Sequence, residues 1–465
     1  MSQPNNQYDC SFLEDILPKA HVAFDDSRRE QYSVDASPHI PSMPDAVVWP
    51  QSTEETSKLL AAANDRKIPV TPWSGGSGLE GSAIPVDGGI VCNLSDLVSI
   101  EIRPEDLEAT VGSGVVYDDL NEKTGQYGLR FPPGISSGDV ATIGGMVATN
   151  ASGFNAVRYG ETRDHVRNLE VVLSDGRVLQ CGRNVVKTSS GYSLKDLFVG
   201  SEGTLGVITH TTVALTGIPE QKRDFLVTFP SVEDAAMTVS EIIRYGLKPG
   251  ALEFMDPLTI ELINAYRARY DLPEKPTLLI ELHANNGGID DDREFVRNIC
   301  RDRGAETWEA TNPDTEWDVW QARKDAYSAF QANDLGLDVL LVGDIVVPIS
   351  KYPALVTSVH QIAEELSVPC PCVGHAGDGN LHYNPLVDPE SQSSVENGYE
   401  LNHRIIQQAL AVGGTITGEH GVGVGKRRYM SEEHGEALEV MATLKRTFDP
   451  NGILNPGKIL PSADE

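Results

Sequence analysis

The stretch FPPGISSGDVATIGGMVATNASG, residues 131–153, decides the fold that the sequence predicts. It holds glycines at 134, 138, 144, 145 and 153, and few of its side chains are bulky. Such a run makes a poor core, but it lets the backbone approach a large flat ligand closely. Two more glycine-rich segments stand far away along the chain, PWSGGSGLEG at 72–81 and GSEGTLGVIT at 200–209. Together the three segments predict one large shared cofactor rather than three unrelated turns.

The segment at 72–81 can bind an anion through its backbone. Successive glycine amides can turn inward and form a nest that suits a pyrophosphate. The spacing is neither GxGxxG nor GxxxxGK[ST], so a Rossmann or P-loop site is not indicated.

The segments GHAGDGNLHYN at 374–384 and GEHGVG at 418–423 give the most specific indication of a catalytic and metal-binding site. His375, His382 and Glu419 form a normal ligand set for a divalent ion that keeps open positions. A 2-hydroxy acid could chelate such an ion, which would acidify the hydroxyl group. His420 stands next to Glu419 and could accept the hydroxyl proton.

One arginine could bind the carboxylate of such a substrate. Arg323, in WQARKDA at 320–326, is expected near the start of a helix and could grip a carboxylate with two hydrogen bonds. The alternative is an ordinary surface arginine beside Asp325 and Glu316.

The composition excludes several classes of protein. The 465 residues suit two or three domains, and 37 basic against 68 acidic residues give a formal net charge of −31. Such a charge argues against nucleic acid or an anionic membrane as a default partner. We interpret it as a solvated acidic surface adapted to a salt-rich, halophilic cytoplasm. The sequence shows no apolar run of about 20 residues and no secretory signal pattern.

The six cysteines do not resemble a disulfide framework, which favours a reducing, cytoplasmic setting. Cys370 and Cys372 are interpreted as small buried strand residues rather than metal ligands.

The expected elements divide the chain near residues 214–224. Before this point the sequence predicts strands alternating with helices, including a helix at 52–68 capped by Ser or Thr and a hairpin turn at 175–176. After it we expect an α+β unit with an antiparallel sheet and helices on one side. Residues 1–45 are expected to begin with a helical lead-in, and the stretch from about 421 is expected to form one helix.

Nearly the whole chain resembles the FAD-linked oxidoreductases of the vanillyl-alcohol-oxidase superfamily, in their D-lactate dehydrogenase and glycolate oxidase flavin-subunit branch. The motifs TIGGMVATNASG, GYSLKDLFVGSEGTLGVIT, GHAGDGNLH, GEHGVG and NPGK carry this resemblance. It implies an α+β fold with a two-subdomain, PCMH-type FAD-binding domain at 1–220. It further implies a ferredoxin-like cap domain for the substrate at 221–420 and a C-terminal helical return at 421–465.

The resemblance also implies roles for individual residues. His375, His382 and Glu419 would be metal ligands, with Zn or Mn as the ion, and His420 would be the catalytic base. Arg323 would hold the substrate carboxylate, and Asn384 would lie near the substrate. The FAD-binding residues implied by the motifs are Ser74, Gly75, Gly76, Ser77, Gly78, Gly81, Pro133, Gly134, Asp139, Thr142, Gly144, Gly145, Ala148, Ser152, Gly153, Glu202, Gly203, Gly206, Ile208 and Asn455.

Two departures from the family pattern are informative. Some relatives attach FAD covalently through a histidine in the first glycine-rich loop, but residues 73–81 contain none, so we expect non-covalent FAD. Relatives of the 2-hydroxyglutarate type have a lysine two residues before the match of Asp344, where this chain has Val342. An apolar side chain cannot pair a second carboxylate, which favours a short acid.

The expected activity is therefore oxidation of a small D-2-hydroxy acid, with D-lactate as the first choice. Glycolate, D-2-hydroxyglutarate and, more distantly, a transferase resembling alkylglycerone-phosphate synthase remain alternatives. A cytochrome, a quinone or an electron-transfer flavoprotein is the expected acceptor, through which the protein could be peripheral to a membrane. The oligomeric state stays open, with a homodimer as one option.

Overall fold

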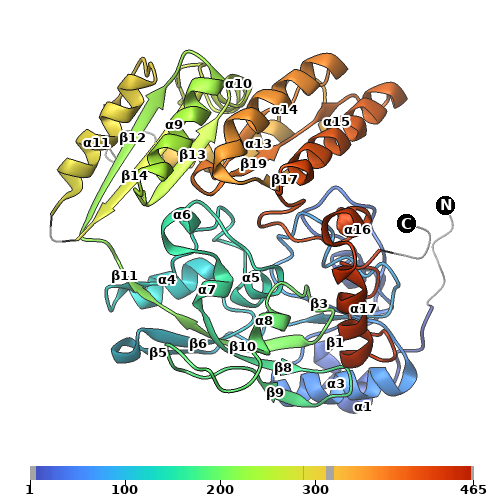
Figure 1. Cartoon of the computed structure of the whole chain (residues 1–465). Helices are drawn as coiled ribbons and strands as arrows, with labels where there is room; N and C mark the ends of the chain where they lie inside the picture. The colour runs from blue at the N-terminus through green and yellow to red at the C-terminus, as the bar shows by residue number, and fades with distance from the viewer. Residues whose placement is uncertain (1–6, 286, 311–318, 462–465) are drawn as a thin grey trace. The chain divides into compact units, whose positions relative to one another are not determined.

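The computed structural model describes residues 7–285, 287–310 and 319–461. Contacts divide the chain into two compact units. The first unit contains the residues up to 152, residues 160–218 and the residues from 419 onward. The second contains residues 153–159 and 219–418 (Figure 1). In the described part of the chain, no helix is both long and apolar enough to cross a membrane.

The first unit begins with a small, largely parallel sheet. Its strands run in the order β1 (Val22–Ala23), β2 (Ala46–Val48), β4 (Ile90–Asn93) and β3 (Val70–Trp73), with β4 parallel to both β2 and β3. Helix α3 (Thr53–Arg66) connects β2 to β3. The side chain of Ser52 accepts a hydrogen bond from the Glu55 amide, so the helix and cap expected at 52–68 are confirmed.

The second sheet of this unit is antiparallel. Its order is β5 (Ile100–Arg103), β6 (Glu108–Gly112), β10 (Val207–Ala214), β8 (Val166–Val172) and β9 (Val178–Gln180). Gly176 adopts a φ of 84° in the turn between β8 and β9, as the hairpin prediction required. Helices α4 (Tyr117–Gly125) and α5 (Ile143–Thr149) contribute Leu120, Ile143 and Met146 to the core beneath this sheet.

The ends of the chain differ from expectation. The N-terminal lead-in consists of two short helices, α1 (Leu13–Ile16) and α2 (Asp26–Glu30). The expected single C-terminal helix is wrong, because α16 (Met430–His434) and α17 (Ala437–Phe448) are separate. Gly435 lies between them with a φ of 51°, a conformation that interrupts an α-helix. The unit also contains α7 (Thr162–His165), α8 (Lys195–Phe198) and the short pair β7 (Leu129–Arg130) and β11 (Thr216–Gly217).

The second unit is built on a seven-stranded sheet in which every neighbouring pair is antiparallel. The strand order is β15 (Glu309–Ala310), β12 (Gln221–Thr228), β14 (Thr277–Ala284), β13 (Ala251–Met255), β18 (Cys372–Gly374), β19 (Asn380–Tyr383) and β17 (Gly343–Val346). A separate pair joins β16 (Asp338–Val339) to β20 (Leu386–Val387).

The prediction that helices lie on one side of this sheet is wrong. Ala251 and Met255 of β13 share a core with α10 (Pro257–Tyr266), α12 (Val319–Lys324) and α13 (Ala326–Gln331). Leu252 and Phe254 point to the opposite face and are also buried. The remaining helices of the unit are α6 (Ala156–Tyr159), α9 (Val232–Arg244), α11 (Ile289–Asp302), α14 (Tyr352–Leu366) and α15 (Gln392–Ala411). In Figure 1, α9 and α11 lie beside β12, β13 and β14.

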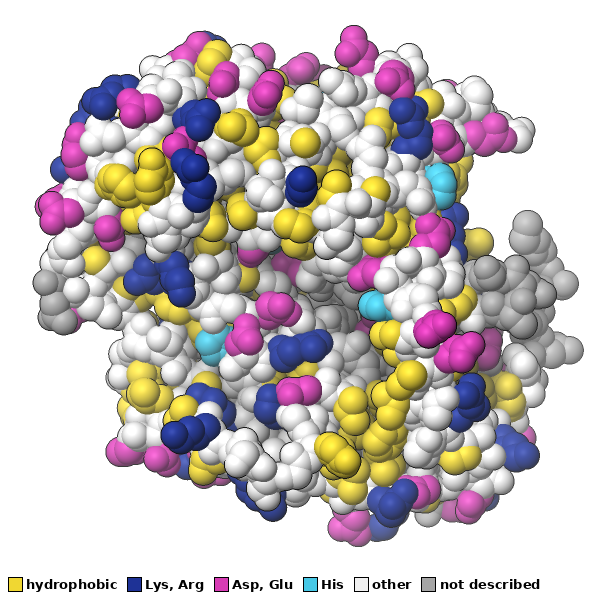
Figure 2. Space-filling model, in the orientation of Figure 1, with side chains coloured by type: hydrophobic (Ala, Val, Ile, Leu, Met, Phe, Trp, Pro, Cys, Tyr) yellow, Lys and Arg dark blue, Asp and Glu magenta, His cyan; other side chains and the backbone are white. Residues whose placement is uncertain are grey.

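Acidic side chains are spread over the visible surface rather than gathered in one patch, with Lys and Arg between them (Figure 2). This distribution fits the interpretation of a solvated acidic surface. The six cysteines are buried and free.

Candidate functional site

The three glycine-rich segments meet against one short helix in the first unit. The hydroxyl groups of Ser74 and Thr142 are 2.6 Å apart, and Thr142 caps α5 by accepting from the Gly145 amide. At the other end of α5, the amide of Gly200 donates to Val147 and that of Glu202 donates to Ala148, at 3.0 and 2.8 Å. Segments that are distant in sequence therefore meet at helix α5, as a shared cofactor requires.

The glycines of this surface serve two different purposes. A Cβ at Gly144 would lie 2.4 Å from the Ser113 side chain, so this glycine lets α5 pack closely against the end of β6. A Cβ at Gly145 would meet nothing nearer than the Thr142 hydroxyl at 3.3 Å. Gly144 is explained by close packing against Ser113, whereas the groups nearest to Gly145 are the hydroxyl groups of Thr142 and Ser74.

The remaining residues predicted to bind FAD differ in how tightly they pack and in how far they are buried. Five of the glycines pack tightly, since an added Cβ would lie within 2.7 Å of another residue. They are Gly75 (against Val140), Gly76 (Trp73), Gly81 (Val424), Gly203 (Pro72) and Gly206 (Val171). Asp139 is exposed, and Gly153 is grouped with the second unit. The other predicted positions are at least half-buried and comprise Ser77, Gly78, Pro133, Gly134, Ala148, Ser152 and Ile208.

Asn455 ties the C-terminal return to this surface. Its backbone amide donates to Val70, and its side-chain amide donates to the carbonyl oxygens of Ser82 and Glu202 at 2.9 and 2.7 Å. Its side-chain oxygen is buried and accepts no hydrogen bond from the described residues. A buried acceptor of this kind favours a bound donor, so the surface fits a polar cofactor.

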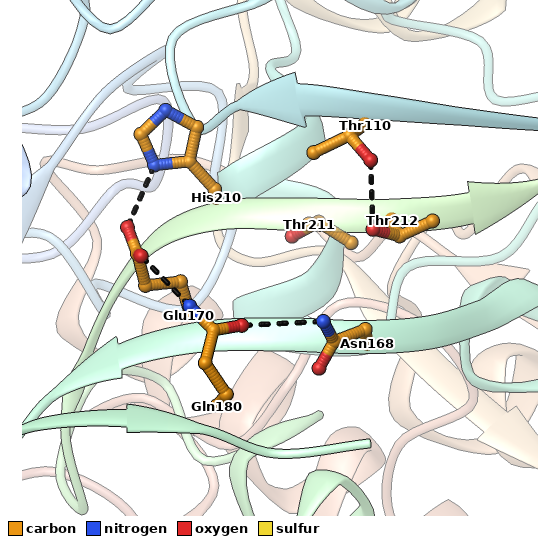
Figure 3. A pocket seen from close by; sticks show the side chains of 7 residues that line it. All are labelled: Thr110, Asn168, Glu170, Gln180, His210, Thr211 and Thr212. Atoms are coloured by element: carbon orange, nitrogen blue, oxygen red, sulfur yellow. Dashed lines mark hydrogen bonds and ion pairs between the residues drawn. The ribbon is translucent and has the colours of Figure 1, made fainter. Parts of the chain in front are cut away.

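A pocket of about 240 Å³ lies elsewhere in the first unit, on the face of the antiparallel sheet (Figure 3). Its lining pairs His210 with Glu170 at 3.0 Å and contains none of the predicted site residues. The hydrogen bond from His210 lowers the pKa of Glu170 to about 2. The other lining side chains pair with one another, but Asn168 Oδ1 and the Thr211 hydroxyl have no hydrogen-bond partner among the described residues. We assign the pocket no role.

The two histidines of the GHAGDGNLH motif come together in the second unit. His375 follows β18, His382 lies in β19, and a short turn with Gly379 at a φ of 85° reverses the chain between them. Their ring centroids are 5.2 Å apart with the planes at 89°, and both residues are buried. The motif thus brings two imidazoles side by side.

Glu253 in β13 orients two of the predicted site residues at once. Its carboxylate accepts from His375 Nδ1 at 2.7 Å and from Arg323 Nε at 2.9 Å. Burial alone would raise the pKa of Glu253, but its interactions with His375 and Arg323 hold it below its usual value. A proton fixed on Nδ1 leaves Nε2 of His375 as an electron-pair donor, the arrangement of a metal-binding histidine.

Arg323 is therefore not the surface arginine considered as an alternative. It is 8% exposed and held by Glu253. Asp325 instead pairs with Arg267 and Tyr270, and Glu316 lies outside the described residues.

Asp344 in β17 plays the corresponding part near His382. Its carboxylate accepts from Asn380 at 2.7 Å, from the Thr417 hydroxyl at 2.9 Å and from the Gly418 amide at 2.8 Å. His382 Nδ1 lies 3.6 Å away. Asp344 thereby fixes the chain at the residue before Glu419. Glu419 and His420 are grouped with the first unit, where the segment continues to Gly425.

Asn384 lies two residues beyond His382, so the two side chains point the same way along an extended chain. It is 1% exposed, and its amide nitrogen donates to Pro371. Its side-chain oxygen is buried and accepts nothing from the described residues. The position suits contact with a ligand at the histidines.

Sequence reasoning missed Glu253 and Asp344. Each is a single acid in an apolar strand, ALEFM at 251–255 and GDIVV at 343–347. A carboxylate at such a position must be paired when it is buried, and that is the signal that could have revealed both.

A further cluster of Asp256, His360 and Cys372 has a structural explanation. Asp256 caps α10 and pairs with His360 at 3.0 Å, while the Cys372 thiol donates to the Cys370 carbonyl. This agrees with the interpretation of both cysteines as buried structural residues.

Comparison with known proteins relates both units to flavoenzymes. The family described as "FAD binding domain" matches residues 44–182, and "FAD linked oxidases, C-terminal domain" matches residues 218–459. The chain is 38% identical to a probable mitochondrial D-lactate dehydrogenase of Danio rerio, covering 93% of this chain and 87% of that protein. It is also 38% identical to the glycolate oxidase subunit GlcD of Bacillus subtilis, covering 94% and 93%.

Solved structures establish the fold at low sequence identity. p-Cresol methylhydroxylase superimposes with a TM-score of 0.80 at 16% identity, covering 98% of this chain and 96% of its own. An alkyldihydroxyacetonephosphate synthase gives 0.76 at 19%, covering 98% and 87%. The predicted α+β architecture with a PCMH-type FAD-binding domain is confirmed. The chain belongs to the FAD-linked oxidases, the family that contains the D-lactate dehydrogenases and the GlcD glycolate oxidase subunits.

Proposed function

We propose that this flavoenzyme oxidises a small D-2-hydroxy acid, with D-lactate to pyruvate as the first choice. The observation that carries the proposal is the double hydrogen bonding of Glu253, which holds His375 and Arg323 on one carboxylate. A metal-binding imidazole and a carboxylate-binding guanidinium held together match the two functional groups of a 2-hydroxy acid. Relatives with this activity in their names include the cytochrome-type enzymes of Arabidopsis thaliana and Saccharomyces cerevisiae.

In this proposal Arg323 binds the substrate carboxylate and Asn384 contacts the substrate. His375, His382 and Glu419 hold a divalent ion, Zn or Mn, which would polarise the hydroxyl group when bound. Glu419 is one peptide unit beyond Gly418, so its Cα lies about 3.8 Å from a residue fixed by Asp344. His420 takes the hydroxyl proton onto its imidazole as the hydrogen on the α-carbon leaves with its electron pair.

The residues of the first unit hold non-covalent FAD, the cofactor that accepts this hydride. Ser74, Gly145 and Asn455 border the surface on which it would lie, and residues 73–81 contain no histidine for covalent attachment. We assign the other FAD-binding residues predicted from the motifs to the same role, except for the carboxylate of Glu202, which bonds to the backbone of Val422 and Gly423.

The substrate is proposed to be short. Val342 is buried, 7% exposed, two residues before Asp344. It offers no charge to the distal carboxylate of D-2-hydroxyglutarate. The similarity to GlcD subunits makes glycolate the second candidate. We propose a cytochrome, a quinone or a flavoprotein as the electron acceptor.

The test is anaerobic mixing of the FAD-loaded protein with an acid while flavin absorbance is recorded. The panel is D-lactate, L-lactate, glycolate and D-2-hydroxyglutarate. We expect D-lactate to bleach the flavin absorbance, glycolate to bleach it less, and L-lactate to leave it unchanged. Bleaching by D-2-hydroxyglutarate alone would contradict the short-acid assignment, and no bleaching by any acid would contradict the proposed reaction.

A further inference from the structure

Two buried acids of the first unit hold the segment that follows His420. Glu80 comes from the first glycine-rich loop, and Glu202 comes from the third. Both are 5% exposed. Both acids bind residues 421–426, which follow Glu419 and His420 directly. The glycine-rich loops that we propose border the flavin therefore also fix the backbone next to these two residues.

Glu202 holds this segment through its carboxylate. One oxygen accepts from the Val422 amide at 2.7 Å, and the other accepts from the Gly423 amide at 2.9 Å. Gly421 has a φ of 84°, and a Cβ there would lie 2.9 Å from the same carboxylate. Backbone and carboxylate are thus fitted to each other at three consecutive residues.

Glu80 completes the contact mainly through its backbone. Its carbonyl oxygen accepts from the Val424 amide at 2.8 Å, and its carboxylate pairs with Lys426 at 2.9 Å. A Cβ at Gly423 would lie 1.9 Å from this carbonyl oxygen. Gly421, Gly423 and Gly425 are therefore required by the close approach of Glu202 and Glu80.

Within the described part of the chain, the carboxylate of Glu202 accepts its hydrogen bonds from the backbone amides of Val422 and Gly423. Burial raises the pKa of Glu202 to about 7, while the hydrogen bonds from Val422 and Gly423 oppose this rise. Such a buried carboxyl group needs both amides in place.

We propose that Glu202 is a positioning residue for Glu419 and His420. The motif resemblance placed it at the flavin, but its carboxylate acts on the backbone two residues beyond the catalytic base. This inference rests on the proposed function for the role of His420.

The test compares Glu202→Gln with the matched control Glu170→Gln, which changes an acid of the same unit on the sheet face. A glutamine can accept only one of the two amide hydrogen bonds. We expect kcat with D-lactate to fall by about 10- to 100-fold, with KM and bound FAD nearly unchanged. Loss of FAD with normal kcat per bound flavin would instead make Glu202 a flavin contact and overturn the inference.

Hydrogen exchange gives a readout that does not depend on turnover. The amides of Val422 and Gly423 should exchange faster in Glu202→Gln than in wild type or Glu170→Gln. Gly421→Ala disturbs the same contact from the other side and should give the same result if Glu202→Gln does not fold. Unchanged exchange would refute the positioning role, whereas an inactive wild type with faster exchange in the variant would refute only the proposed reaction.

Discussion

The glycine-rich surface of the first unit, which we propose binds the flavin, and the histidine cluster of the second are held in place by different means. In the first, backbone groups bond to backbone groups, as between Gly200 and Val147, and glycines such as Gly144 permit the close approach. In the second, buried carboxylates hold charged side chains, as Glu253 holds His375 and Arg323. One arrangement depends on the shape of the chain and the other on electrostatic pairing, so the two should fail differently when altered.

The largest effect on stability is expected at the carboxylate shared by His375 and Arg323. Glu253→Gln leaves the buried Arg323 without its charged partner, which costs about 3–5 kcal/mol of unfolding free energy. Turnover should fall by a further factor of about 10 to 100, because His375 loses its orienting acceptor. Urea unfolding and steady-state kinetics measure the two effects. Glu306→Gln removes a partly exposed ion pair and should cost less than about 1 kcal/mol. Equal losses in both variants would contradict the account.

The histidine cluster also shows where sequence reasoning stops. The histidines, Arg323 and the glycine-rich loops belong to short sequence motifs. Residue types and spacing within these motifs were therefore enough to predict them as site residues. Glu253 and Asp344 lie 122 and 38 residues before their histidines (375 − 253 and 382 − 344), and only the antiparallel pairing of β13, β18, β19 and β17 brings them close.

The fold, like the site, could be predicted only where local sequence signals determine the structure. The capped helix at 52–68 and the hairpin at 175–176 follow from local signals. The helices on both faces of the second sheet do not, because Ala251 and Leu252 are both apolar and do not reveal which face each covers. The break at Gly435 was visible as a glycine, but a glycine within a helical pattern does not by itself end a helix.

A smaller effect is expected in the flavin surface. Gly144→Ala places a Cβ 2.4 Å from the Ser113 side chain and should cost about 1–3 kcal/mol. The fraction of protein that carries FAD should fall, while turnover per bound flavin stays nearly normal. Gly125→Ala, at a helix position where a Cβ meets nothing within 4 Å, should be neutral or stabilising by about 0.5–1 kcal/mol. Reduced turnover per bound flavin in Gly144→Ala would contradict the expectation that this glycine affects flavin binding and stability but not the reaction.

The acidic surface should make both regions depend on salt. The net charge of −31 repels itself at low ionic strength, and added salt screens this repulsion. We expect the melting temperature to rise between low and molar KCl, measured by circular dichroism at neutral pH. A melting temperature that falls with salt would reject the halophilic interpretation.

The smallest effect concerns Glu170. Its pKa is lowered from 4.5 to about 2, and the hydrogen bond from His210 is the largest cause. A lowered folded pKa stabilises the protein above the unfolded value, and this contribution is lost as pH falls from about 4.5 towards 2. It should amount to less than about 1 kcal/mol because the pair is partly exposed. The difference in unfolding free energy between wild type and Glu170→Gln should shrink between pH 6 and pH 3, and a constant difference would contradict the assignment.

The central claim is that His420 removes the hydroxyl proton of a D-2-hydroxy acid above bound flavin. Stopped-flow reduction of the flavin by D-lactate, without oxygen, tests it most directly in wild type and His420→Ala. With bound FAD unchanged, the rate of flavin reduction should be lower in the variant by about 10²- to 10⁴-fold. A rate within a few-fold of wild type would show that His420 is not the base.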